Sequence, residues 1–322
     1  MRFIVVGLGA VGGTVAALLR RAGYDVVGIA RGAHLEAIRA NGLTLATPRE
    51  TVVSKFPAYG SIYEIAPGSD DAVVLAMKTQ DTAAALGAAA AAGFDGARIV
   101  CLQNGLENER LALRRFADVY GVCVVLPSAY DTPGCVEDFG DPHPGILDIG
   151  RWPAGQDKVS QEIAAAFRQA GFKSESVSDI QRLKAGKLLM NLGNAIELAC
   201  GPGAHWLELY GRVRAEGEAV LTAAGIAFAG QADDAARRGD FKIAPIGGKS
   251  RRGGSTWQSV ARGLGSVETE FLNGEIAMLA RLHRTSAPLN AKLTAIAGRI
   301  VSGDIRAGTI RPDDIPSYGV SP

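Results

Sequence analysis

A glycine-spaced turn between a short apolar strand and an apolar helix constrains this chain more than any other feature. The predicted strand Arg2–Val6 runs directly into Gly7, Gly9 and Gly12, spaced G-x-G-x-x-G, and an apolar helix follows over residues 14–21. In such a turn the first glycine permits a tight reversal, the second lets the backbone approach a pyrophosphate, and the third lets the helix pack on the strand. The N–H groups and the dipole at the helix start attract the phosphates. The turn therefore predicts dinucleotide binding.

The position of this turn in the sequence supports the same interpretation. A second predicted strand, Asp25–Ala30, closes a compact β-α-β unit soon after the helix. A glycine-rich turn with no ligand is the alternative, because the motif alone has many chance matches. The residues predicted to contact the cofactor are Gly7, Leu8, Gly9, Ala10, Val11 and Gly12.

The residue after the second strand distinguishes between the two nicotinamide dinucleotides. NAD sites usually place an acid at the end of this strand to bind the ribose 2′-hydroxyl. Here Arg31 follows the strand, and Asp25 stands at its opposite end. A guanidinium binds a 2′-phosphate through paired, charge-assisted hydrogen bonds. We therefore predict NADP(H) rather than NAD(H). A solvated loop arginine is the alternative.

Length, charge and cysteine content exclude several classes of protein. A chain of 322 residues predicts two domains, and a net charge of +1 gives no reason to expect nucleic acid or an anionic membrane as a partner. No run of 18 apolar residues and no secretion signal occur, so we expect no membrane span. The four cysteines and four histidines are scattered without metal spacing, which predicts no metal site and reduced thiols in a cytoplasmic protein.

The first half of the chain alternates predicted strands with predicted helices, which indicates a parallel sheet covered on both faces. A Gly-, Pro- and Asp-rich stretch over residues 129–151 then predicts antiparallel edge strands, followed by a helix at 159–170 and a short strand at 172–176. The other apolar strands are expected at residues 71–76, 98–102 and 119–127, with helices at 81–92 and 107–116.

From Ser178 onward strand patterns nearly vanish, and helices are expected from 178 and over 207–224, 266–282 and 287–302. The predicted fold class is α/β: a Rossmann-type parallel-sheet domain over residues 1–177, then an all-helical domain over 178–322 for substrate binding and dimerisation. A homodimer is possible, since amphipathic helical domains often pair. The basic, glycine-rich segment 239–254 is expected to be a solvated loop, or else a loop that closes over a ligand.

A polar stripe on the helix after Ser178 is the strongest candidate for chemistry in the second half. At about 100° per residue, the stripe lies within roughly 80° of the helix circumference. Asparagine is a poor residue for a helix interior, so its presence argues against a merely solvated face, which is the alternative. The members of the stripe are Lys184, Lys187, Asn191 and Asn194.

Such a stripe suits the reduction of a carbonyl, because hydride arrives from one side and a proton from the other. A lysine close to the developing alkoxide stabilises its charge and donates the proton. A carboxylate could anchor a substrate hydroxyl, and Glu268 and Glu270 are the candidates. Only one of the two is expected to point inward, and solvated helix acids are the alternative.

Two further polar positions follow strands of the predicted sheet. Lys78 follows the strand at 71–76, and Asn104 follows the strand at 98–102. In open α/β sheets ligands bind outside the carboxyl ends of the strands, so both are expected to contact the cofactor. Ordinary turn chemistry at Asn104-Gly105 is the alternative.

Together these residues resemble the ketopantoate reductase family of NADPH-dependent 2-dehydropantoate 2-reductases over nearly the whole chain. The resemblance implies a Rossmann domain followed by a helical domain, and pantothenate biosynthesis as the context. It is carried by the glycine turn, Arg31, Lys78, Asn104, Lys187-x-x-x-Asn191, Ser255-Thr-Trp-Gln258 and Glu268-Thr-Glu270-Phe-Leu-Asn273-Gly274.

The resemblance also implies roles for individual residues. Lys187 corresponds to the family's catalytic lysine and Glu268 to its substrate-binding glutamate. Arg31 and Lys78 would contact NADPH. Cofactor or substrate would be held by Asn104, Asn191 and Ser255, with Asn194 added on the substrate side.

The substrate side departs from the family pattern at one turn of the helix. Where the family often has a second asparagine this chain has Ala195, and Asn194 comes one residue early. The leading hypothesis is reduction of a small 2-oxo acid, first ketopantoate, to a 2-hydroxy acid. Related enzymes acting on an imine, an amino acid or another hydroxy acid remain open, as does a non-catalytic NADP-binding protein.

Overall fold

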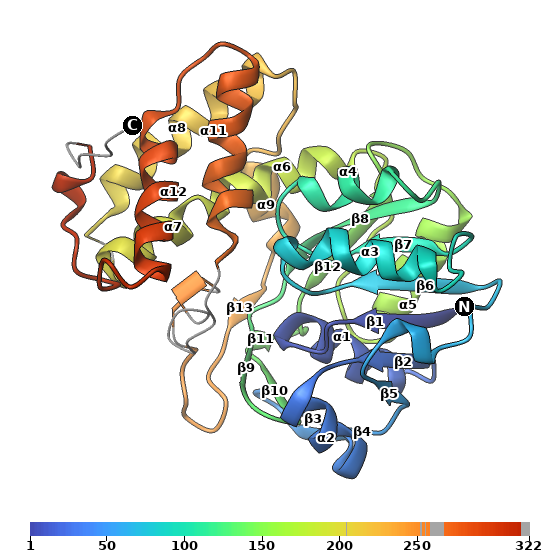
Figure 1. Cartoon of the computed structure of the whole chain (residues 1–322). Helices are drawn as coiled ribbons and strands as arrows, with labels where there is room; N and C mark the ends of the chain where they lie inside the picture. Colours follow the sequence, from blue (N-terminus) through green and yellow to red (C-terminus); the bar gives the residue numbers. More distant parts are fainter. Residues whose placement is uncertain (204, 252, 255, 258–266, 317–322) are drawn as a thin grey trace. The chain divides into compact units, whose positions relative to one another are not determined.

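The computed structural model describes residues 1–203, 205–251, 253–254, 256–257 and 267–316, and its contacts divide the chain into two compact units (Figure 1). The first unit joins Met1–Gln181 to Ala232–Arg251, and the second joins Arg182–Gln231 to Arg252–Pro322. The predicted fold class is confirmed, with a mixed, mainly parallel sheet first and a helical part second. The predicted domain boundary between residues 177 and 178 stays a prediction.

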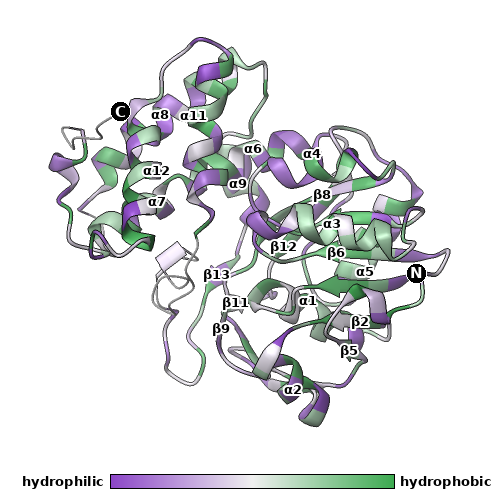
Figure 2. Ribbon diagram, in the orientation of Figure 1, coloured by the Kyte–Doolittle hydropathy of each residue, from purple (hydrophilic) through white to green (hydrophobic). Residues whose placement is uncertain are grey.

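A seven-stranded sheet in the order β12-β8-β7-β6-β1-β2-β5 forms the centre of the first unit. All neighbours are parallel except β12, which runs antiparallel to β8. Beyond their charged first residues, the central strands β1 and β6 are hydrophobic (Figure 2), as expected of strands covered on both faces. The strands are β1 (Arg2–Val6), β2 (Asp25–Ile29), β5 (Ala58–Tyr59), β6 (Asp71–Leu75), β7 (Arg98–Cys101), β8 (Val119–Val125) and β12 (Ile146–Arg151).

Helices cover this sheet much as the alternating pattern predicts. One face packs on α1 and α5 through a single apolar core that includes Phe3, Val15 and Phe167. The segment expected as a strand at 172–176 pairs in parallel with β12 through bridges at Lys173 and Ser176, although it does not form a continuous strand. The helices of this unit are α1 (Ala10–Arg21), α2 (Gly32–Asn41), η1 (Ile62–Glu64), η2 (Thr79–Asp81), α3 (Thr82–Ala91), α4 (Glu107–Leu113) and α5 (Lys158–Gln169).

A smaller sheet in the order β4-β3-β10-β9 packs beside α1. Two of its strands, β9 and β10, are antiparallel and confirm part of the edge strands expected over residues 129–151, whereas β3 and β4 precede that stretch. Its strands are β3 (Leu43–Ala46), β4 (Thr51–Ser54), β9 (Ser128–Thr132) and β10 (Cys135–Asp138), and β11 (Gly140–Asp141) pairs with β13 (Lys242–Ile243).

The basic segment 239–254 belongs to the first unit as far as Arg251. Besides the β11–β13 pairing, Lys249 is 2.9 Å from Glu137, and Lys242 is 3.3 Å from Asp141. Acidic side chains of the first unit therefore neutralise part of the positive charge of this segment.

Ion pairs lie along the amino ends of the parallel strands. Arg2 of β1 binds Asp71 of β6 at 2.7 Å, and Arg98 of β7 binds Asp70 at 2.7 Å. Asp70 also accepts the N-terminal ammonium group at 2.6 Å. This edge is thus held by pairs between neighbouring strands.

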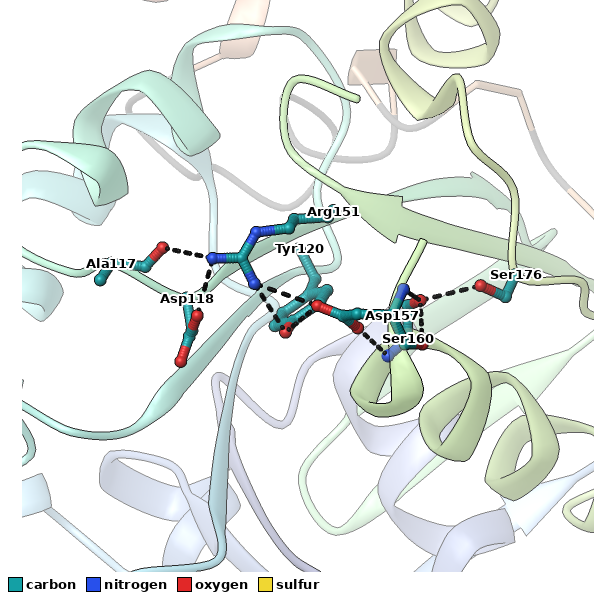
Figure 3. A network of polar contacts seen from close by, with 7 residues as sticks. All are labelled: Ala117, Asp118, Tyr120, Arg151, Asp157, Ser160 and Ser176. Atoms are coloured by element: carbon teal, nitrogen blue, oxygen red, sulfur yellow. Dashed lines mark hydrogen bonds and ion pairs between the residues drawn. The ribbon is translucent and has the colours of Figure 1, made fainter. Parts of the chain in front are cut away.

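Figure 3 shows how the same edge continues to β8, β12 and α5, through Ala117, Asp118, Tyr120, Arg151, Asp157, Ser160 and Ser176. Arg151 binds Asp118 at 2.8 Å and Asp157 at 3.0 Å, and Tyr120 donates to Asp157 at 2.8 Å. Asp157 also caps α5 by accepting from the Ser160 N–H at 2.8 Å. Burial, then the hydrogen bond to Asp157, raises the pKa of Tyr120, so its hydroxyl remains a donor.

The second unit is helical in its described residues. The predicted helix from Ser178 is not continuous, because it is interrupted at Leu192. Among the described residues, none of the helices is both long and apolar enough to span a bilayer. The helices are α6 (Ile180–Asn191, whose start belongs to the first unit), α7 (Gly193–Cys200), α8 (Leu207–Ala223), η3 (Glu268–Phe271), α11 (Asn273–Leu282), α12 (Pro288–Val301) and η4 (Pro312–Asp314), while most of α9 (Gln231–Arg238) belongs to the first unit.

Candidate functional site

Two of the three glycines in the turn between β1 and α1 have a geometric reason to be glycine, and the third, Gly9, faces open space. Gly7 has a φ of +96°, a backbone conformation that residues other than glycine rarely adopt. A Cβ on Gly12 would lie 2.1 Å from the Gly7 carbonyl oxygen and 2.7 Å from the Ala76 Cβ, so the helix meets the strand only without a side chain there. A Cβ on Gly9 would have nothing within 4 Å, which leaves open space beside the start of α1. The open side of the turn is where a ligand can approach the backbone.

Arg31 lies at the same edge of the sheet as this turn. The N–H groups of Gly7 and Leu8 both donate to the Ile29 carbonyl at the end of β2, at 3.0 and 3.2 Å. Arg31 follows two residues later, is exposed, and stands at the N-cap position of α2. The backbone of Arg31 therefore follows directly on the contact between β2 and the glycine turn, and its side chain is exposed.

A buried network of neutral side chains supports the next two strand ends. Gln103 donates to the Met77 carbonyl at 2.9 Å and to the Thr82 hydroxyl at 2.8 Å. Thr82 in turn donates to the side chain of Asn108 at 2.7 Å, and Asn108 donates to the Asn104 carbonyl at 3.0 Å. The network fixes the two loops that carry the half-buried Lys78 and Asn104.

Thr82 and Asn108 are not among the site residues predicted from the sequence. Both are fully buried in the structure, and the available signal was a polar residue at or near the start of a helix that follows a strand end. Gly105 has a φ of +83°, so turn chemistry accounts for the glycine after Asn104.

In the second unit the polar stripe is largely buried, so the solvated-face alternative is wrong there. Lys184 is 3% exposed and Asn191 is 8% exposed, while Lys187 is half-buried one turn before Asn191. The Asn191 Nδ2 atom is buried and has no hydrogen-bond partner among the described residues. Because buried amides are normally paired, this amide is a candidate donor to a ligand.

A pair of buried asparagines binds the carbonyl of Leu192, the residue between α6 and α7. Asn273 donates to the Leu192 carbonyl at 3.2 Å and to the Asn290 side chain at 3.1 Å. Asn290 donates onward to the Val213 carbonyl at 3.0 Å. These amides tie the carbonyl of Leu192, next to Asn191, to α8, α11 and α12.

The expectation that only one of the two acids points inward is confirmed. Glu268 is 8% exposed at the start of η3, whereas Glu270 is exposed. The neighbouring Thr269 hydroxyl is buried without a hydrogen-bond partner among the described residues. A carboxylate and a hydroxyl are thus buried together at the start of this short helix.

The remaining substrate-side predictions have separate outcomes. Asn194 is half-buried on α7, two residues beyond Leu192, whose φ of −59° and ψ of −26° remain helical. Ser255 lies outside the described residues, but the nearby Gly254 N–H donates to Glu197 of α7 at 2.8 Å.

Among the described residues no group of three or more histidine, cysteine or acidic side chains could hold a metal ion.

The fold and the glycine turn define a nicotinamide-dependent oxidoreductase with a sheet unit and a helical unit. The chain belongs to the ketopantoate reductase family. The family model described as "Ketopantoate reductase PanE/ApbA" matches residues 3–154, and the corresponding C-terminal model matches residues 179–300.

Individual relatives agree with this assignment. A protein from Pyrococcus horikoshii named 2-dehydropantoate 2-reductase is 29% identical over 305 residues, which are 92% of this chain and 96% of that one. The crystal structure of a PanE/ApbA family ketopantoate reductase from Ralstonia eutropha JMP134 is 27% identical, with a TM-score of 0.78 over 94% of this chain and 99% of that one.

A third similarity shows the fold alone. The structure of D-mandelate dehydrogenase with NADH and anilino(oxo)acetate is 16% identical and has a TM-score of 0.76, over 98% of this chain and 100% of that one.

Proposed function

We propose that the protein reduces a small 2-oxo acid to a 2-hydroxy acid with NADPH, and that the substrate is 2-dehydropantoate and the product pantoate. The observation that carries the proposal is the match of both halves of the chain to ketopantoate reductase models, together with relatives named 2-dehydropantoate 2-reductase over almost their full length. We further propose that residues 1–177 and 178–322 act as cofactor and substrate domains, that the protein is a homodimer, and that it works in the cytoplasm.

The first unit has the residues that NADPH requires. The backbone of Gly7–Gly12 and the start of α1 would hold the pyrophosphate, which the open space at Gly9 supports. Arg31 would bind the 2′-phosphate, because it is exposed at the end of β2, where NAD sites usually carry an acid. Lys78 and Asn104, on loops fixed by the Gln103 network, would contact the rest of the cofactor. When bound, NADPH supplies the hydride.

The second unit has the residues for the proton and the substrate. Lys187 would donate a proton from its ammonium group to the substrate's carbonyl oxygen, which becomes the new hydroxyl. The unpartnered Asn191 amide would donate a hydrogen bond to a substrate oxygen, and the buried Glu268 would accept one from a substrate hydroxyl. Asn194 and Ser255 would complete the substrate contacts.

A related enzyme with another substrate is the second candidate, and one observation favours it. Ala195 is 2% exposed, so the amide expected in the family at this position is replaced by a buried methyl group. Asn194 does not restore that amide in the same place, because it precedes Ala195 by one residue on α7. A different 2-oxo acid or an imine would then fit better than ketopantoate.

The test is NADPH oxidation, followed by absorbance, with 2-dehydropantoate and a panel of 2-oxo acids and imines. We expect the fastest turnover with 2-dehydropantoate, and a higher kcat/KM for another compound would favour the second candidate. Lys187→Ala should lower kcat by about 10²–10⁴-fold while leaving NADPH affinity within a factor of a few.

The control for this variant is Lys158→Ala on α5, whose side chain is 88% exposed and which should behave like the parent. A Lys187→Ala enzyme with parental kcat would rule out the role of Lys187 as proton donor. Tight NADPH binding without turnover on any compound would instead indicate a non-catalytic NADP-binding protein.

A further inference from the structure

We infer that His34 is a positioning residue for cofactor selection: its neutral imidazole ties the glycine turn to the first turn of α2, and so sets the place of Arg31 relative to the pyrophosphate-binding backbone. The inference rests on the proposed use of NADPH. His34 lies three residues after Arg31, and it is 7% exposed. It is neither an expected cofactor contact nor part of the proposed chemistry.

The hydrogen bonds of His34 define a single tautomer. The Gly134 N–H donates to the His34 Nδ1 atom at 2.8 Å, and a backbone N–H can only donate. The proton must then reside on Nε2, which lies 2.7 Å from the Leu8 carbonyl oxygen and donates to it. One imidazole therefore links three segments: the glycine turn, the start of α2 and the turn between β9 and β10.

The surroundings of the ring keep it neutral. Burial lowers the pKa of His34, although the hydrogen bond to Leu8 acts in the opposite direction. A proton on Nδ1 would also place two N–H groups against each other at Gly134. The ring of Tyr130 packs on the imidazole with 4.5 Å between the ring centroids.

The link to Leu8 fixes the part of the turn that faces the pyrophosphate. Leu8 lies between Gly7 and Gly9, and its N–H is already held by the Ile29 carbonyl at the end of β2. Its side chain is 1% exposed and lies so close to β2 that a Cβ on Gly28 would be 2.5 Å from it. His34 holds the remaining polar group of this residue, the carbonyl.

The contact at Gly134 fixes the other side of the imidazole. Gly134 has a φ of +77°, and a Cβ there would lie 2.8 Å from the Ala37 side chain of α2. The β9–β10 turn therefore packs closely on α2. Removal of His34 would take away the link between the start of α2 and the Leu8 carbonyl and leave the bonds from Gly7 and Leu8 to Ile29 in place, so the position of Arg31 relative to the glycine turn would be held less firmly.

The experiment measures the dissociation constants of NADPH and NADH by fluorescence for the parent and for His34→Leu, which fills the space but makes neither hydrogen bond. We expect the preference for NADPH over NADH to fall by about tenfold, as for residues coupled in one network. In an Arg31→Ala background the same substitution should leave the preference unchanged. His34→Gln, whose amide both donates and accepts, should recover part of the preference, and it serves as the test if His34→Leu does not fold.

The matched control is Ile38→Ala, which removes a side chain of α2 that is 3% exposed and should lower the melting temperature without changing the preference. The inference is overturned if His34→Leu and His34→Gln lower only the melting temperature, or if the His34 and Arg31 effects on the preference multiply independently. A parent protein that binds NADH as tightly as NADPH would overturn the cofactor proposal itself, and that result is read before any variant.

Discussion

The two edges of the large sheet are built from different chemistry. At the amino edge, Arg2, Arg98 and Arg151 pair with acids of neighbouring strands or loops at 2.7–3.0 Å. At the carboxyl edge, the network around Gln103 consists of amides and hydroxyls, and the glycine turn offers backbone N–H groups. The comparison indicates that charge pairs at one edge hold the strands, while neutral groups at the other fix the loops that carry the proposed cofactor contacts.

The largest expected effect comes from two glycines of the same turn. In Gly12→Ala the new Cβ would meet the Gly7 carbonyl oxygen at 2.1 Å, so the backbone must shift, at a cost of about 3 kcal/mol in the free energy of unfolding. NADPH binding should be lost with it. Gly9→Ala meets open space and should change the free energy of unfolding by less than about 1 kcal/mol.

Gly9→Ala should nevertheless weaken NADPH binding by about tenfold or more, since the methyl group occupies the place where the pyrophosphate approaches. Urea unfolding and NADPH titration of both variants check this prediction. If Gly9→Ala binds NADPH as the parent does, the open side of the turn is not the phosphate site.

The next effect concerns the amino edge. Asp71 is 2% exposed, so Arg2→Met would leave a buried carboxylate without its cation and should cost about 3 kcal/mol. Arg98→Met is the matched control, because its partner Asp70 is 60% exposed and such pairs contribute less than about 1 kcal/mol.

Neither arginine variant should alter the NADPH dissociation constant, measured by titration at a temperature where both are folded. An Arg2→Met protein that unfolds like the parent but binds NADPH weakly would contradict the assignment of stability to the amino edge and of cofactor binding to the carboxyl edge.

Asp138 is buried like Asp71, but no cation pairs with its carboxylate among the described residues. Asp138 is fully buried, accepts from the Gly140 N–H at 3.2 Å, and has no hydrogen-bond partner for Oδ2 among the described residues. Burial raises its pKa from 3.8 to about 7, although the Gly140 N–H lowers it. Because the folded state keeps the proton that the unfolded state loses, this contribution to stability is complete below pH 3.8 and is lost as the pH rises to about 7.

The free energy of unfolding of the parent should therefore fall by about 2–4 kcal/mol relative to Asp138→Asn between pH 4 and pH 8. Urea unfolding of both proteins across this range measures the difference. Parallel pH profiles of parent and variant would show that Asp138 is not protonated in the folded protein.

The sequence predicts the features that depend on neighbours in the chain. The strand Arg2–Val6, the glycine turn and the position of Arg31 follow from local periodicity and spacing, and the first of these matches β1 at both ends. The contact between the Leu192 carbonyl and the Asn273 amide could not be predicted, because it joins residues 81 apart in the chain. The link between His34 and Gly134 spans 100 residues, so no local pattern reveals it.

Hydrogen–deuterium exchange with and without NADPH tests the central claim, that the carboxyl edge binds the cofactor and the amino edge holds the fold. We expect slower exchange in residues 7–12 and 31–35 when NADPH is added, and unchanged exchange in residues 118–120 and 151–160. Protection that appears at 118–120 and 151–160 instead, or no protection at 7–12 under saturating NADPH, would contradict it.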